Sequence, residues 1–143
     1  MKFRLIIDEN RDEEILVYAH QKTPLVEAIE RLVMQEEFRL IGYIDREAVK
    51  LDFDKICRFT VEENRVYAET VDEKYRLKYR LCEIEEKAPA SFVKINQSCL
   101  ANIEMIERFD ASVSGSLLVR FKNGSTDYVS RRQLKTVKER IGL

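Results

Sequence analysis

The feature that most constrains the fold of this chain is a series of short β-like runs separated by polar turns. Ile56–Val61, Val66–Val71 and Tyr75–Tyr79 are joined by links of only a few polar residues, which suits antiparallel hairpins. Similar runs follow further along the chain, at Phe92–Ile95, Ile103–Phe109, Leu117–Lys122 and Thr126–Val129. The pattern predicts a mostly β (α+β) fold.

Two helices and one tight turn interrupt this β region. Leu81–Lys87 is predicted to be a short helix that ends at Ala88-Pro89. Asn123-Gly124 lies between two of the runs, and this dipeptide accepts the positive φ angles of a type I′ hairpin turn. A final helix is predicted over about residues 131–141.

The first 41 residues predict a separate ββα unit. Runs at Lys2–Ile7 and Glu14–Ala19 read as strands around a turn, and Thr23-Pro24 carries the N-cap and first-position signals of a helix. Four apolar residues at helical spacing are expected to form one buried stripe, Leu25, Ile29, Leu32 and Val33. A unit of about 40 residues cannot bury enough surface to be stable alone, so it must pack on the rest of the chain, on a second copy, or on both.

Length and composition exclude several classes of protein. A chain of 143 residues fits one domain of about 100–200 residues. Its longest runs without a charged residue are nine residues. Since about 20 are needed to span a bilayer, no membrane insertion is expected. Asp8 and Glu9 cut the first apolar run short, so no secretory signal is predicted. Cys57, Cys82 and Cys99 suit neither a disulfide scaffold nor a zinc site, which favours a reducing, cytoplasmic compartment.

Signatures of catalysis and of cofactor binding are scarce. His20 is the single histidine, and the chain has no glycine-rich phosphate loop, no HExxH and no CxxC pair. We therefore expect no catalytic residue, no metal site and no cofactor, and the protein is not expected to be an enzyme. The enzymatic alternative would require a cleft with perturbed titratable groups.

The net charge of -1 conceals an uneven distribution of charge. Residues 1–45 carry 6 basic and 10 acidic side chains, whereas residues 46–143 carry 19 and 16. Between Tyr128 and Arg140 five basic residues accompany a single acid. Such asymmetry indicates a polyanion partner, although a solvated helical face explains it equally well.

The start of the final helix contains two arginines. Ser130 and Gln133 match a capping box, which would place Arg131 and Arg132 in the first helical turn. Cations there oppose the helix dipole at a cost of about 0.3–1 kcal/mol each. A phosphate or a guanine edge opposite them would reverse that sign. The alternative is that two exposed arginines are tolerated because solvent screens them.

A second polar cluster lies between Phe92 and Ile103. Its apolar residues could alternate into a core while Lys94, Asn96, Gln97 and Ser98 project outward. Lysine suits a phosphate, and asparagine or glutamine can pair with adenine in the major groove. A plain polar turn between two strands is the alternative.

Two consecutive segments resemble the LytTR family of bacterial DNA-binding domains, FVKINQSCLANIEMIERF and LLVRFKNGSTDYVSRRQLKTVKERI. The shared features are an aromatic–basic–polar–Ser–x–x–x–Asn region and, later, an Asn-Gly hairpin that leads into Val-Ser-Arg and a terminal helix. The resemblance covers residues 42–143. It implies an elongated fold of three small antiparallel sheets, with loops that enter successive major grooves of duplex DNA.

The residue-level match to this family implies a set of DNA-binding residues, Asn64, Arg65, Lys94, Asn96, Gln97, Ser98, Arg131, Arg132 and Lys135. Gln97 and Arg132 would contact base edges, with Asn64 as a third candidate. The expected phosphate contacts are Lys94, Ser98, Arg131 and Lys135. Asn102 matches the family's asparagine, for which a structural role is expected.

The sequence thus predicts a cytoplasmic bacterial transcription regulator that binds double-stranded DNA through residues 42–143. Residues 1–41 are expected to mediate self-association as a homodimer. The alternative is a protein-interaction module on the same fold that has lost DNA binding.

Overall fold

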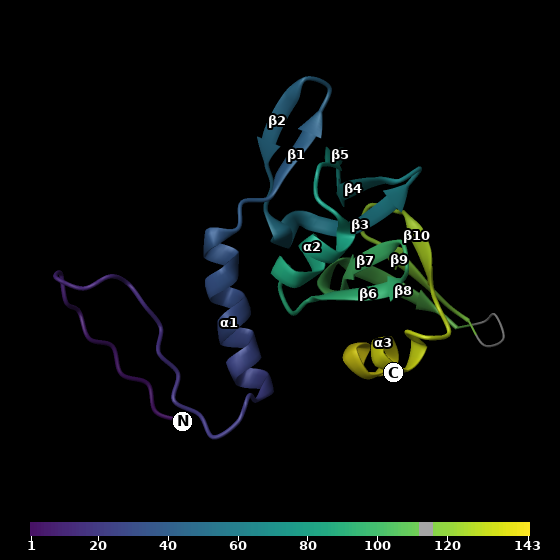
Figure 1. The fold of residues 1–143 in the computed structure, drawn as a ribbon. Coiled ribbons are helices and arrows are strands. Elements are labelled where there is room, and N and C mark those ends of the chain that lie inside the picture. The colour runs from purple at the N-terminus through teal and green to yellow at the C-terminus, as the bar shows by residue number, and fades with distance from the viewer. Residues whose placement is uncertain (112–115) are drawn as a thin grey trace.

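The computed structural model describes residues 1–111 and 116–143, without the side chains of residues 35–37 (Figure 1). Its elements in chain order are α1 (Pro24–Glu37), β1 (Ile41–Ile44), β2 (Glu47–Lys50), β3 (Ile56–Glu62), β4 (Arg65–Thr70), β5 (Lys74–Leu77), α2 (Leu81–Lys87), β6 (Phe92–Asn96), β7 (Cys99–Asn102), β8 (Ile106–Asp110), β9 (Leu117–Phe121), β10 (Thr126–Val129) and α3 (Leu134–Ile141). Most of the predicted strands are confirmed, as is the helix at Leu81–Lys87, and the final helix is present but begins at Leu134 rather than near residue 131.

The strands form two antiparallel sheets rather than the three small sheets expected. One sheet has the order β2-β1-β5-β4-β3-β7-β6, and the other has the order β10-β9-β8. The β1–β2 hairpin joins the larger sheet through the single residue pair Tyr43↔Arg76. Because of this junction, the β1–β2 hairpin is part of the larger sheet and not a sheet of its own. The expected number of three sheets is therefore wrong.

Two hydrophobic clusters cover opposite faces of the larger sheet. Phe59 of β3 and Phe92 of β6 pack with Ile84 of α2 in the first cluster. Cys57 and Ile95, from the same two strands, pack with the three-stranded sheet and α3 in the second cluster. The layers are therefore α2, the larger sheet, and the smaller sheet with α3, and β3 and β6 are buried on both faces.

The type I′ geometry predicted for one hairpin turn occurs instead in another. At Asn123-Gly124 only Gly124 has a positive φ, of 86°, and the Gly124 N–H donates to the Phe121 carbonyl at 2.9 Å. That is a three-residue loop with a glycine bulge, so the predicted type I′ turn is wrong here. Asn123 is held instead by its side-chain oxygen, which accepts from Ser125 N at 3.0 Å. Between β3 and β4, by contrast, both Glu63 and Asn64 have positive φ, of 49° and 63°, as a type I′ turn requires.

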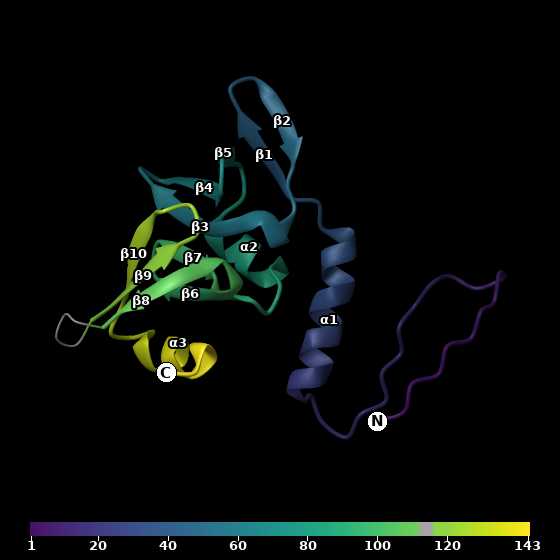
Figure 2. The same cartoon turned by 180° about the vertical axis from the view of Figure 1, so that it is seen from behind.

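The N-terminal unit is a helix without the two predicted strands. Residues 1–22, which we call the N-terminal arm, form no strand, and only a turn links Arg11 N to the Asp8 carbonyl at 3.4 Å. Helix α1 begins as predicted, with the Thr23 hydroxyl accepting from Val26 N at 3.3 Å. The predicted buried stripe is wrong for a single chain, because Leu25 and Leu32 are 52% and 63% exposed. Figure 2 shows the reason: α1 stands beside the β body, and the arm lies beyond it.

Candidate nucleic-acid interface

Three turns lie in a row along one side of the β body. They are the β3–β4 turn at residues 63–64, the β6–β7 turn at residues 97–98 and the segment 130–133 that precedes α3. The Val61 N–H at the end of β3 donates to the Ser98 carbonyl at 2.9 Å, and Ser130 N donates to the Ile95 carbonyl at 2.8 Å. The β6–β7 turn is therefore bonded to β3 through Ser98, and the segment 130–133 is bonded through Ile95 to β6, the strand that leads into that turn.

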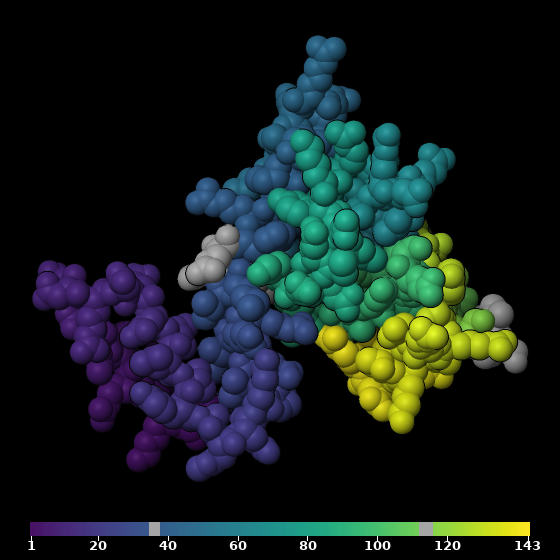
Figure 3. Space-filling view, viewed as in Figure 1, coloured from purple at the N-terminus to yellow at the C-terminus, as the bar shows by residue number. Residues whose placement is uncertain are grey.

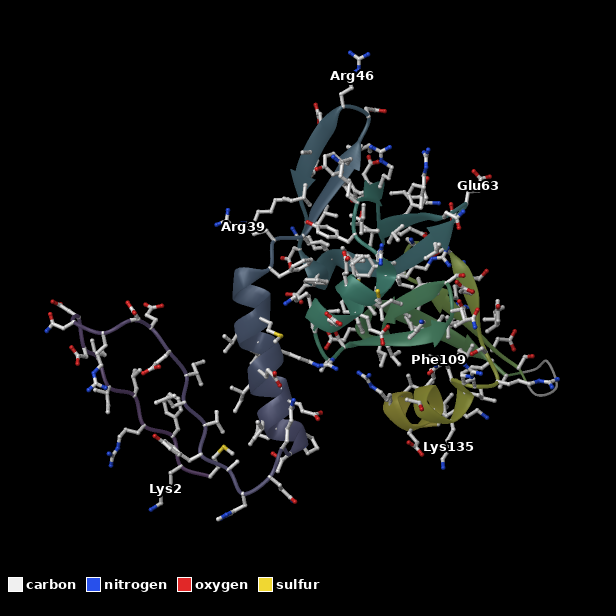
Figure 4. All side chains as sticks on the ribbon, in the orientation of Figure 1. Lys2, Arg39, Arg46, Glu63, Phe109 and Lys135 are labelled. Carbon is white, nitrogen blue, oxygen red and sulfur yellow. The ribbon has the colours of Figure 1, made fainter. Side chains whose placement is uncertain are left out.

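Most of the predicted site residues are exposed along this row. We call the following set the three-turn surface: Asn64, Arg65, Lys94, Gln97, Ser98, Arg131, Arg132 and Lys135. All are exposed except Lys94, which is half-buried on β6. Figure 4 labels Glu63 and Lys135 near the two ends of the row, and both side chains point away from the body.

Asn96 differs from the other predicted site residues because its side chain is buried. It is only 4% exposed, so the expectation that it projects outward is wrong. Its amide nitrogen donates to Asp127 Oδ1 at 3.0 Å and to the Tyr128 carbonyl at 2.8 Å. Its amide oxygen accepts from Ser98 N at 2.9 Å. Asn96 therefore ties the β6–β7 turn to β10, the strand that leads to Arg131 and Arg132.

A buried ionic network continues from Asp127 into the larger sheet. Arg58 donates to Asp127 Oδ2 at 2.9 Å and to Glu69 Oε2 at 2.7 Å, and its side chain is 13% exposed. Its guanidinium also lies 5.6 Å from the centroid of the Phe121 ring. Burial alone would lower the pKa of Arg58, but the Glu69 and Asp127 carboxylates outweigh it and raise that pKa. The arginine therefore stays charged and holds β3, β4 and β10 together.

Sequence reasoning missed this network, although a signal for it exists. Arg58 and Glu69 each interrupt an otherwise apolar or β-branched run, at facing positions of one predicted hairpin. Opposite charges inside two paired strands point to an inward ion pair, since an unpaired buried charge is costly. Asp127 could not be added to the pair without knowing where β10 lies.

The two arginines before α3 do not lie in its first turn. Helix α3 begins at Leu134, and its N-cap Gln133 makes no side-chain capping bond, so the predicted capping box is wrong. Ser130 instead extends the path of β10 through its bond to Ile95, and a backbone turn follows, in which Gln133 N donates to the Ser130 carbonyl at 3.0 Å. Arg131 and Arg132 are exposed in this turn, before the N-cap rather than inside the helix.

Two further residues considered in the sequence, Asn102 and His20, lie outside the three-turn surface. The buried Asn102 donates to the Ile56 carbonyl at 2.9 Å and accepts from Glu104 N at 3.2 Å, which agrees with its expected structural role. His20 is exposed in a bend of the arm. Within residues 1–111 and 116–143, no group of three His, Cys, Asp or Glu side chains could hold a metal. No helix in these ranges is both long and apolar enough to cross a membrane.

Comparisons with known proteins agree with this architecture. Over its full length the chain is 32% identical to a protein of Staphylococcus aureus strain NCTC 8325 named an HTH-type transcriptional regulator, and it covers 99% of that protein. The counterpart in strain MSSA476 is 31% identical, with the same coverage. A solved LytTr DNA-binding domain from Bacillus cereus has a similar fold, with a TM-score of 0.69 at 19% identity, over 73% of this chain and 97% of that one. Because residues 46–142 also match the family of LytTr DNA-binding domains directly, the chain belongs to the LytTR family.

Proposed function

We propose that this protein is a transcription regulator that binds duplex DNA by placing the three-turn surface against successive major grooves. Membership of a DNA-binding family supports this proposal, as do relatives named as transcriptional regulators. The observation that carries it is the row of exposed cationic and amide side chains on turns that are held together by backbone bonds and by the Asn96–Asp127 contact. A rigid row of this kind fixes the spacing of the contacts before DNA arrives.

The charges of the surface favour a polyanion, and the exposed Glu63 beside Asn64 is the carboxylate that opposes one. Glu62 is paired with Lys74 at 2.7 Å, and Asp127 is paired with Arg58, so these carboxylates are largely neutralised. No ion pair within the described residues involves any of the surface cations, Arg65, Lys94, Arg131, Arg132 and Lys135. Phosphates can therefore bind these cations without displacing a protein carboxylate.

Two residues of the surface suit direct reading of bases. The Arg132 guanidinium can donate two bonds to guanine, and the Gln97 amide can pair with adenine through two bonds. Asn64, at the tip of the β3–β4 turn, is a third candidate. We assign Lys94, Ser98, Arg131 and Lys135 to contacts with phosphates. Arg65 is expected to face DNA beside them. Asn96 is assigned to positioning the β6–β7 turn, since its polar atoms are already bonded within the protein.

Selection of bound fragments from random duplex DNA, followed by affinity measurements over a range of salt, tests the proposal. Arg132→Ala and Gln97→Ala should each relax discrimination at one base position, by about 1–3 kcal/mol. Lys135→Ala should weaken binding to all sequences alike and reduce the salt slope by about one.

The matched control is Arg39→Ala, because Arg39 is exposed near α1 and points away from the row (Figure 4). Its affinity and salt slope should equal those of the unmodified chain. Unchanged base preference in both the Arg132 and the Gln97 variants would overturn the assignment of base contacts. If no duplex is selected even at low salt, the fold serves protein interaction instead.

A further inference from the structure

The N-terminal arm and α1 together expose an unusually large amount of apolar surface. Eleven of the sixteen exposed large apolar side chains in the described residues lie in the first 32 positions. Phe3 and Tyr18 are 92% and 91% exposed. At about 60–120 Å² for each such side chain, the total is comparable to the ~800 Å² per partner of a stable protein interface.

The arm also has the pattern of strands without the hydrogen bonds of strands. Apolar residues dominate its two limbs, Lys2–Ile7 and Glu14–Ala19, yet neither limb pairs with another strand in the described chain. Extended backbone with free N–H and C=O groups is a template for pairing with another chain. Figure 3 shows the arm projecting from the molecule, well away from the β body.

The two limbs carry opposite charge and do not pair with each other in the described chain, which favours a second copy of this chain as the partner. The first limb carries Lys2 and Arg4 and no acid, whereas the second limb carries Glu14 and no base, with Glu13 directly before it. The turn region between the limbs contains Asp8, Glu9, Arg11 and Asp12. Opposite charges on facing strands are stabilising, and like charges are destabilising. Two copies related by a twofold axis would make the favourable pairing of unlike limbs twice.

We propose that residues 1–33 form a homodimer interface in which the first limb of each copy pairs with the second limb of the other. The exposed face of α1, with Leu25 and Leu32, completes the apolar contact. The arm is part of the region that matches the staphylococcal relatives, since those matches cover 100% of this chain. The dimer would present two three-turn surfaces, and it forms without DNA.

Sedimentation of the full chain with reversed charges tests this pairing. One variant carries Lys2→Glu and Arg4→Glu, and the other carries Glu13→Lys and Glu14→Lys. The unmodified chain should sediment at twice its mass of 16.9 kDa. Each variant alone should dimerise at least about tenfold more weakly, because like charges then face each other. An equimolar mixture should restore the dimer, now with one copy of each variant.

The mixture separates pairing between copies from pairing within one copy. If the limbs of each chain paired with each other, mixing would restore nothing, and the proposal would be overturned. An unmodified chain that sediments as a monomer at about 100 μM would overturn it too, because an interface of this size associates at that concentration. Arg39→Glu is the charge control outside residues 1–33, and it should leave the dimer intact.

Discussion

Strand β9 and the second limb of the arm have the same kind of sequence and opposite surroundings. In β9 the alternate residues Leu117, Val119 and Phe121 are fully buried. In the limb Ile15 and Val17 also alternate, yet they are 63% and 37% exposed. The difference is the neighbour: β9 lies between β8 and β10 and packs on the larger sheet, whereas the limb has no strand beside it.

This contrast separates two properties that alternation is often taken to imply together. Alternation says that a segment can lie in a sheet with one apolar face. Whether that face is buried depends on a partner surface, which lies elsewhere in the chain or in another chain. In the β body the partner is local to the fold, and for the arm we have proposed a second copy.

The largest expected effect on stability comes from removing a buried aromatic ring from the β body. Removing a ring from the arm is the comparison. Phe59 is fully buried, with its ring centroid 6.0 Å from that of Phe53 and 5.5 Å from that of Phe92. Phe59→Ala should lower the free energy of unfolding by about 3–5 kcal/mol. Phe3→Ala in dilute protein should change it by less than about 0.5 kcal/mol, because the ring is already in water.

Urea denaturation of both variants at two protein concentrations measures the comparison. The Phe59 effect should not depend on concentration. The Phe3 effect should grow at high concentration if the arm is buried between copies. A large loss for Phe3→Ala in dilute protein would show instead that the arm folds onto its own β body.

A smaller effect is expected from the ionic network that holds the β body. Asp127→Ala leaves Glu69 as the one carboxylate paired with Arg58 in the described residues and removes an acceptor from Asn96, so the chain should lose about 1–3 kcal/mol of stability. Its effect on DNA binding separates two physical causes. Loss of a negative charge should strengthen binding, whereas loss of the tether between the β6–β7 turn and β10 should weaken it.

We expect the tether to dominate, so Asp127→Ala should bind selected DNA less tightly at every salt concentration. Asp72→Ala removes an exposed carboxylate from the β4–β5 turn and serves as the control for charge alone. Tighter binding by the Asp127 variant would mean that the three turns keep their positions without the network.

Local signals in the sequence predicted some elements to the residue and others not at all. Leu81–Lys87 and Thr126–Val129 were predicted with their observed bounds, because a Pro-terminated helix and a hairpin strand are specified by nearby residues. Strand β7 was missed, because all four of its residues are buried and so show no alternation. The β1–β2 hairpin was also missed, although its four residue pairs are all local.

The candidate site was predictable to a similar extent. The exposed cations and amides lie on turns that polar residues indicate by themselves. The inward direction of Asn96 could not be predicted, because its partner Asp127 lies 31 residues away on a strand of the other sheet. The predicted start of α3 was wrong for the same reason. Ser130 N donates to the Ile95 carbonyl of β6, and the helix begins only at Leu134.

The smallest expected effect concerns the two hairpin turns of the β body. Gly124 adopts its φ of 86° without a side chain, whereas Glu63 adopts a φ of 49° with one. A residue with a Cβ pays about 1 kcal/mol there, and asparagine tolerates the conformation better. Glu63→Asn should therefore stabilise the chain by about 0.5–1 kcal/mol and remove a carboxylate beside Asn64.

Gly124→Ala is the matched opposite, because nothing lies within 4 Å of the added methyl group and only the backbone conformation is opposed. It should destabilise the chain by about 1 kcal/mol in the same thermal or urea denaturation. If DNA lies against the β3–β4 turn, Glu63→Asn should also tighten binding, and the gain should shrink as salt rises. Stabilisation without any change in DNA affinity would leave the turn a structural element and remove Asn64 from the base contacts.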